Sequence, residues 1–228
     1  MIAMTKSLRT RLNTQTFNNT KMREVKFHTH LTFLNSIIFK IYTFFVDGHS
    51  MEPTLHNGDV LTQSNNRVFR RGDIVVIAAA ENGKFKTIVK RIVGLPGDKI
   101  IIRKQDNLLL LNGKVVTETF IKNPILKISN LKDNTGKLTV VPEHSVFLLG
   151  DNRMNSLDSR RFGPVKIDTI IRKVTAVSTK DGKYIKLTRP DVYDNVAGDN
   201  RYVTAKLNQK AIVNIIKHNK KQIKSGGK

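Results

Sequence analysis

Turn-forming residue pairs divide the chain between residues 47 and 200 into short runs. These pairs are Asn57-Gly58, Arg71-Gly72, Asn82-Gly83, Pro96-Gly97, Asn112-Gly113 and Asp181-Gly182. The apolar runs between them, such as Ile74–Ala80 and Ile88–Val93, have the length of strands, and no helical pattern separates them. This spacing predicts a mainly β fold, an antiparallel sheet or barrel-like domain.

Two of these turns predict specific hairpins. Asn112-Gly113 lies between Leu108–Leu111 and Lys114–Thr117, and Asp181-Gly182 lies between Val174–Ser178 and Tyr184–Leu187. Asn-Gly and Asp-Gly are favoured in two-residue hairpin loops, because the central positions of such loops need positive φ. Ser145–Leu149 has the pattern of a further strand.

Composition divides the 228 residues into four segments. Residues 1–30 form a basic, flexible N-terminal arm, residues 31–46 an apolar helix, residues 47–200 the β domain, and residues 201–228 a basic C-terminal tail. Within the tail, Ala205–Ile223 is a candidate basic helix, and the chain contains no acidic residue from Asn200 to Lys228.

The apolar helix predicted over Leu31–Val46 suggests a membrane attachment. It would be about 24 Å long, which is shorter than the roughly 30 Å hydrocarbon core of a bilayer. Thr32, Ser36, Lys40 and Thr43 fall on one helical side, as in a helix that lies in the membrane interface. A tilted span and a buried core helix are the alternatives. No small-x-small cleavage site follows the run, so it does not resemble a cleavable signal peptide.

The formal net charge of +22 predicts attraction to a polyanion. The basic residues are spread along the chain and are not gathered with aromatic residues in a recognition helix. We therefore expect contact with anionic membrane lipid and not with nucleic acid. The chain has no cysteine, which excludes disulfides, thiol nucleophiles and zinc–thiolate sites.

Ser50 lies in the stretch Gly48–Leu55, between a glycine and a proline, and is either a turn residue or a nucleophile. A serine hydroxyl becomes nucleophilic only when a neighbouring group takes its proton. His49 is adjacent, but neighbours on an extended chain point to opposite faces. A Ser-His-Asp triad is therefore disfavoured.

Lys90 is a better candidate for the base. A strand period places it on one face with Ile88 and Ile92, and apolar surroundings push a lysine towards its neutral amine. The adjacent Arg91 cannot act as a base, because its guanidinium keeps its proton. The alternative is an edge-strand lysine whose amine reaches solvent.

The stretch Gly150–Arg160 follows a predicted strand and is rich in hydrogen-bonding side chains. If it is extended, Ser156, Asp158 and Arg160 alternate onto one face. The hydroxyl would then be able to orient a neutral amine, while the carboxylate and guanidinium pair and brace the loop. A solvent-exposed polar loop is the alternative.

Together these stretches resemble type I signal peptidases, membrane-bound serine/lysine endopeptidases. Four motifs of that family occur in order between residues 47 and about 165, and the forty residues from Ser50 to Lys90 resemble the compact Gram-positive type. The matching stretches are Ser50–Leu55, Gly72–Val76, Lys90–Asp98, and Gly150–Asn152 through Ser156, Asp158–Arg160 and Gly163.

The resemblance implies a role for each matching residue. Ser50 would be the nucleophile and Lys90 the general base, with Ser156 holding the Lys90 amine. The Asp158 and Arg160 side chains would support the site. The main-chain N–H of Ser50 would donate to the oxyanion.

Two neighbours of Ser50 carry further expectations. Some family members have a hydroxyl two residues before the nucleophile as a second oxyanion donor, but this chain has Gly48 there. We expect Met51 to line a shallow substrate pocket.

The resemblance further implies a monomeric enzyme with no metal and no cofactor. Its partners would be the signal peptides of exported precursor proteins, cut after small residues. Its location would be the cytoplasmic membrane of a bacterium, with the catalytic domain on the outer face.

Two alternative functions share part of this pattern. One is a catalytically marginal signal-peptidase-like module in the assembly of cell-surface proteins, although the chain keeps both Ser50 and Lys90. The other is a soluble self-cleaving repressor protease, for which residues 1–30 are too short to form a DNA-binding domain.

Overall fold

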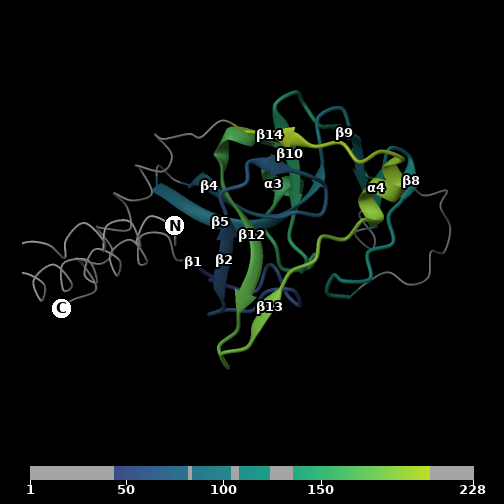
Figure 1. Ribbon diagram of the computed structural model, residues 1–228. Coiled ribbons are helices and arrows are strands. Elements are labelled where there is room, and N and C mark those ends of the chain that lie inside the picture. The colour runs from purple at the N-terminus through teal and green to yellow at the C-terminus, as the bar shows by residue number, and fades with distance from the viewer. Residues whose placement is uncertain (1–43, 82–83, 104–107, 124–135, 206–228) are drawn as a thin grey trace, which may run out of the picture. The chain divides into compact units, whose positions relative to one another are not determined.

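The computed structural model describes residues 44–81, 84–103, 108–123 and 136–205, without the side chains of residues 80–85 (Figure 1). The arm over residues 1–30, most of the helix predicted over residues 31–46 and most of the candidate helix over residues 205–223 lie outside these ranges. Within the described ranges, no helix is both long enough and apolar enough to cross a bilayer.

The body is built on an antiparallel sheet, which confirms the predicted mainly β fold. Figure 1 shows β12 running through the middle of the body, with the β12–β13 hairpin projecting at one end. In spatial order the strands are β1 (Phe44–Phe45), β2 (Val60–Ser64), β12 (Ile170–Ser178), β4 (Ile74–Glu81), β5 (Lys84–Gly94), β10 (Ser145–Leu149) and β11 (Val165–Lys166), with β13 (Tyr184–Lys186) paired to β12.

Two smaller sheets and three short helices complete the described part. One sheet has the order β8 (Lys114–Val115), β7 (Leu109–Leu111), β6 (Lys99–Ile102), β9 (Thr139–Val140), and the other pairs β14 (Val203–Thr204) with β3 (Val68–Phe69). The helices are α3 (Ser159–Phe162), the 3-10 helix η1 (Ile167–Thr169) and α4 (Val192–Ala197).

Both predicted hairpins are confirmed. Strand β7 pairs with β8 across Asn112-Gly113, and β12 pairs with β13 across Asp181-Gly182. Asn112 and Gly113 both have positive φ (53° and 83°), which is the backbone geometry that their residue types favour.

The central strands separate hydrophobic clusters, because successive residues of a strand point to opposite faces. In β4, Ile74 belongs to a cluster that also holds Met51 and Leu55. The next residue, Val75, belongs to a second cluster with Leu148. The turn that carries Ser50 is thus fixed to the core by Met51 and Leu55, which lie one and five residues after the serine.

The helix predicted over Leu31–Val46 is wrong at its C-terminal end, residues 44–46. Phe44–Phe45 forms β1 and pairs with β2. Val46 continues this pairing: its N–H donates to the carbonyl of Asp59 at 2.8 Å, and its carbonyl accepts from Gly58 at 2.7 Å. Cross-strand hydrogen bonds therefore override the helical pattern at the end of Leu31–Val46.

The folded body also extends past the predicted boundary at residue 200. Strand β14 pairs with β3, and Ala205 is buried. The Arg201 guanidinium reaches the buried Asp98 carboxylate at 2.6 Å. The segment predicted as a basic tail therefore begins inside the domain.

Candidate active site

Ser50 and Lys90, which are forty residues apart in the chain, meet in the structure. The Lys90 amine lies 2.7 Å from the Ser50 hydroxyl oxygen and 2.8 Å from the carbonyl of Val89. Lys90 is 3% exposed. Its strand, β5, lies between β4 and β10, so the alternative of an edge-strand lysine is wrong.

The surroundings of Lys90 favour its neutral form. Burial lowers the pKa of the Lys90 amine to about 8, although the carboxylates of Asp158 and Asp151 act in the opposite direction. Ile88 and Ile92, two residues to either side, pack with the second hydrophobic cluster, as the strand period predicts. About a tenth of this amine is therefore neutral and able to accept a proton at pH 7, far more than for an unperturbed lysine.

A tight turn presents the Ser50 hydroxyl. Glu52 donates its N–H to the carbonyl of His49 at 3.3 Å, and Leu55 donates to Met51 at 3.0 Å. Met51 and Leu55 are 1% and 0% exposed, respectively. Met51 thus packs in the core, and the structure gives it no open surface that would line a substrate pocket.

One buried carboxylate connects the nucleophile turn with the strand of the base. Asp151 accepts the hydroxyl of Thr54 at 2.5 Å. It also accepts two hydrogen bonds from Arg91, at 2.8 and 2.6 Å. Thr54 belongs to the turn that carries Ser50, and Arg91 follows Lys90 in β5. Asp151 therefore holds the segments of both reacting residues in place.

The segment after β10 lies directly against the nucleophile. Asn152 donates its main-chain N–H to the carbonyl of Ser50 and its side-chain amide to the carbonyl of His49, each at 3.0 Å. Gly150 is packed so closely that a Cβ there would lie 2.3 Å from the Ser156 hydroxyl and 2.4 Å from the Ser50 carbonyl oxygen. Only glycine fits this approach.

Asp158 and Arg160 form the predicted pair, with contacts of 2.8 and 2.9 Å. Burial would raise the pKa of Asp158, but Arg160 and the N–H of Gly150 together hold it below its usual range. Asp158 also caps the N-terminus of α3 by accepting from the Arg160 N–H.

Ser156 lies close to the pair but does not hold the amine. Its hydroxyl oxygen is buried and makes no hydrogen bond of good geometry to any described residue. It is near enough to Asp158 to help lower the pKa of that carboxylate, and it lies beside Gly150. The bond to Lys90 that the resemblance implies is therefore not formed in this structure.

The two residues before Ser50 make other contacts. The His49 ring is 2.6 Å from a carboxylate oxygen of Glu52, which is consistent with its exclusion as the base. Gly48 has a φ of 92° and donates to Asn57 at 3.0 Å. A hydrogen bond from Lys122, followed by the one from His49, lowers the pKa of Glu52 to about 2.

Several supporting residues carry no distinct signal of their own in the sequence. Asp151 stands within the last motif and Arg91 directly follows Lys90, so adjacency to the predicted site is the signal for both. Glu118 pairs with Arg153 through two contacts of 2.5 Å, and no pattern in the sequence distinguishes it.

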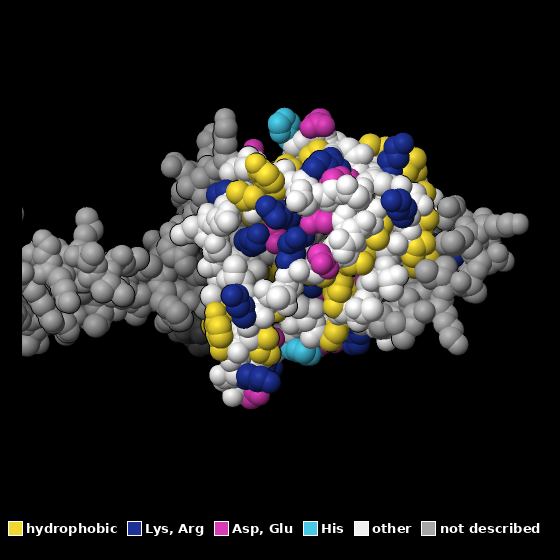
Figure 2. All heavy atoms as spheres, turned by 45° about the vertical axis from the view of Figure 1, so that its right-hand side comes forward, with side chains coloured by type: hydrophobic (Ala, Val, Ile, Leu, Met, Phe, Trp, Pro, Cys, Tyr) yellow, Lys and Arg dark blue, Asp and Glu magenta, His cyan; other side chains and the backbone are white. Residues whose placement is uncertain are grey.

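Figure 2 shows basic and acidic side chains interleaved near the middle of one face of the body.

Comparisons with known proteins find similar chains among signal peptidases. A family model described as "Signal peptidase, peptidase S26" matches residues 21–179. Signal peptidase I of Bacillus caldolyticus is 39% identical over 149 residues, which cover 60% of this chain and 79% of the relative. Signal peptidase I T of Bacillus subtilis is 34% identical over 176 residues, or 68% and 88% of the two chains. A crystal structure of a signal peptidase I from Enterococcus faecalis is 30% identical and covers 44% of this chain and 91% of the other, with a TM-score of 0.34.

Proposed function

Because the chain belongs to the signal peptidase family, peptidase S26, we propose that it is a membrane-associated serine endopeptidase with a Ser50–Lys90 dyad. Relatives named signal peptidase I support removal of signal peptides from exported proteins as its activity. The observation that carries the dyad is the 2.7 Å contact between a buried lysine amine and the Ser50 hydroxyl.

Acylation begins when the neutral Lys90 amine accepts the Ser50 proton. The serine oxygen attacks the carbonyl carbon of the scissile peptide bond and forms a tetrahedral intermediate. When this intermediate collapses, the peptide C–N bond breaks. The Lys90 ammonium gives its proton to the departing amine, and the signal peptide stays bound to Ser50 as an ester.

Deacylation repeats these steps with water. Lys90 takes a proton from the water as its oxygen attacks the ester carbonyl, and then returns that proton to the Ser50 oxygen. The main-chain N–H of Ser50 is the proposed oxyanion donor in both halves of the reaction. Since Gly48 has no side chain, a second donor has to come from the backbone or from water.

The proposed location is the outer face of the bacterial cytoplasmic membrane. The net charge of +22 supports contact with anionic lipid. Residues 31–43, which precede β1 in the sequence, are proposed as the attachment. We further propose a monomer that acts on signal peptides and does not bind nucleic acid.

The proposal is tested by incubating a labelled exported precursor with the intact chain in lipid vesicles. Ser50→Ala and Lys90→Ala should each abolish cleavage, while the exposed Lys99→Ala serves as a matched control that retains it. Circular dichroism should show the same β fold in all four proteins. Cleavage by either dyad variant at the wild-type rate would contradict the assignment.

A further inference from the structure

Behind the proposed active site lies a buried polar group that the reaction does not use. Glu118 is 5% exposed and Tyr193 is 0% exposed. Two guanidinium nitrogens of Arg153 each donate a hydrogen bond of 2.5 Å to the Glu118 carboxylate. The Tyr193 hydroxyl also donates to this carboxylate. Tyr193 comes from α4, Glu118 from the segment after β8, and Arg153 from the segment after β10, so three distant parts of the chain converge here.

The first connection from this group to the site runs through Arg153. Its Nε donates to the carbonyl of Gly150 at 3.0 Å. Gly150 is the residue packed against the Ser50 carbonyl and the Ser156 hydroxyl, and its N–H donates to Asp158. The orientation of Arg153 therefore fixes the residue on which the nucleophile turn rests.

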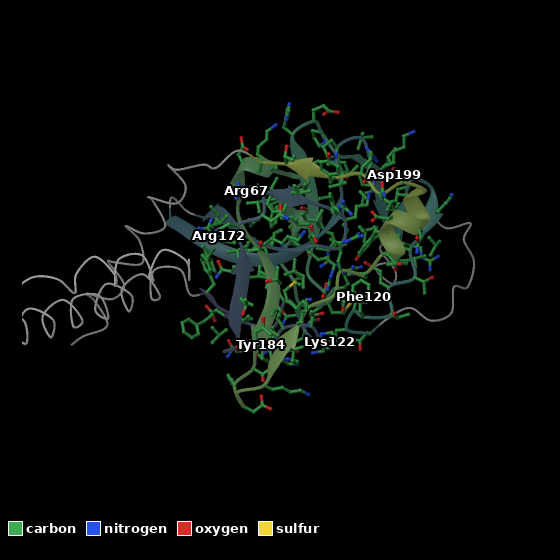
Figure 3. All side chains as sticks on the ribbon, viewed as in Figure 1. Arg67, Phe120, Lys122, Arg172, Tyr184 and Asp199 are labelled. Atoms are coloured by element: carbon green, nitrogen blue, oxygen red, sulfur yellow. The ribbon has the colours of Figure 1, made fainter. Side chains whose placement is uncertain are left out.

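The second connection runs through Phe120, which is labelled in Figure 3. Its ring meets that of Tyr193 edge-on, with centroids 6.1 Å apart. The Arg91 guanidinium lies over the Phe120 ring at 4.6 Å and pairs with Asp151. Through Phe120, Tyr193 thus also supports the Arg91–Asp151 pair, which joins β5 to the turn that carries Ser50.

We propose that Glu118 and Tyr193 are positioning residues for the Ser50–Lys90 pair, acting through Arg153–Gly150 and through Phe120–Arg91–Asp151. This inference rests on the proposed function. Neither side chain needs to touch the substrate. Their role is to hold the Gly150 segment and the Arg91 guanidinium in place, so that the short contact between the two reacting atoms is maintained.

The negative charge of Glu118 can be removed with little change in the shape of the side chain. Glu118→Gln leaves the buried Arg153 without its anionic partner, so we expect the guanidinium to turn and release the Gly150 carbonyl. A displacement of about 1 Å at a reacting group lowers the rate by about 100-fold. We therefore expect kcat for cleavage of a labelled precursor to fall by about that factor, with KM unchanged, since binding surfaces away from the pair are intact.

Asp194→Asn is the matched control. Asp194 follows Tyr193 in α4, is 8% exposed and pairs with Arg189 at 2.7 Å and Arg71 at 3.5 Å. This substitution therefore removes a buried charge from the same helix without touching the Glu118–Arg153 connection. At a temperature where both variants are fully folded by circular dichroism, Asp194→Asn should keep the wild-type kcat. If both variants lose kcat alike, or if Glu118→Gln keeps it, the inference is wrong.

A double variant separates positioning from stability. Glu118→Gln should lower the melting temperature, because it leaves the buried Arg153 charge unpaired. Replacing both partners, Glu118→Leu with Arg153→Met, removes the buried charges together and should recover part of this loss, although the Tyr193 hydroxyl loses its acceptor. We expect kcat to remain low, because the Gly150 carbonyl still lacks its donor. Recovery of kcat along with stability would show a purely structural role. A Ser50→Ala enzyme that still cleaves would instead overturn the proposed function itself.

Discussion

At the scale of single residues, Lys90 carries the chemical argument. A lysine amine in water is almost fully protonated at pH 7 and cannot accept a proton from serine. Desolvation in the strand next to Ser50 lowers the pKa of Lys90 to about 8. The same burial that makes the amine useful as a base makes its protonated form unfavourable in the folded state.

The first prediction concerns pH and rate. Because only neutral Lys90 can take the serine proton, kcat/KM should rise with pH and reach half its maximum near pH 8. Asp158 favours the ammonium form, so Asp158→Asn should move this midpoint to lower pH. Initial rates on a labelled precursor over a pH series that brackets this midpoint check both statements. A profile that falls as Lys90 loses its proton would contradict them.

The second prediction concerns pH and stability. Since the pKa of Lys90 is about 8 in the fold and 10.5 for an unperturbed lysine, protonation of this lysine opposes folding below pH 10.5, and the effect is complete below pH 8. Lys90→Met should therefore raise the free energy of unfolding by roughly 3 kcal/mol at pH 7. The gain should shrink as pH rises from 8 and vanish near 10.5. Urea titrations at the two ends of this range measure it, with Lys99→Met as an exposed control.

At the scale of elements, the segment between β10 and α3 does most to shape the site. Its residues contact the nucleophile turn, cap α3 and pair with Arg91. Gly150 is the point of closest approach.

We expect Gly150→Ala to be a severe active-site variant. Its methyl group would lie 2.4 Å from the Ser50 carbonyl oxygen, which is main chain and cannot rotate away. The expected loss in kcat is about 100-fold or more, because the turn itself has to move. Gly94→Ala is the control: its nearest neighbours are side-chain carbons of Ile100, Val141 and Phe147 at 3.1–3.2 Å. Equal losses in the two variants would show that the effect is a general one on packing.

Elements and reacting residues are predictable from the sequence where the signal is local. Asn112-Gly113 requires a particular backbone geometry, and the alternation around Lys90 follows from the strand period. The Phe44–Phe45 strand is not predictable in this way, because its pairing partners lie in β2 and the local pattern is helical. Glu118 is not predictable, because its buried partners Arg153 and Tyr193 lie on two other segments far away in the sequence, and such contacts produce no periodic pattern.

At the scale of the whole molecule, ion pairs around the buried Arg71 join the segment before β14 to the β3–β4 connection. Arg71 is fully buried and contacts Asp98 at 2.7 and 2.8 Å and Asp199 at 2.6 Å. Asp98 also pairs with Arg201. The segment that leads to β14 is therefore held to the β3–β4 connection through charges and not only through strand pairing.

These ion pairs predict the stability of the protein in acid. Burial opposes ionisation, but hydrogen bonds from Arg71 hold the pKa of Asp98 below its usual range and lower that of Asp199 to about 2. Carboxylates with a lowered folded pKa stabilise the protein above their unfolded value, and that stability is lost as pH falls from about 4 towards 2. The urea midpoint should therefore change little between about pH 4 and pH 8 and fall steeply within this acid window. Asp199→Asn should show a shallower fall, and an unchanged slope would contradict this account.

The burial of Lys90 also has a consequence for chemical labelling. An amine is nucleophilic only when it is neutral, and Lys90 has a lowered pKa and lies beside Ser50, a residue that is partly exposed. A small acylating reagent used near pH 8 should thus modify Lys90 ahead of ordinary surface lysines, provided that it is small enough to pass Ser50. Mass spectrometry of the adduct would then report occupancy of the site, because a bound peptide would shield that amine.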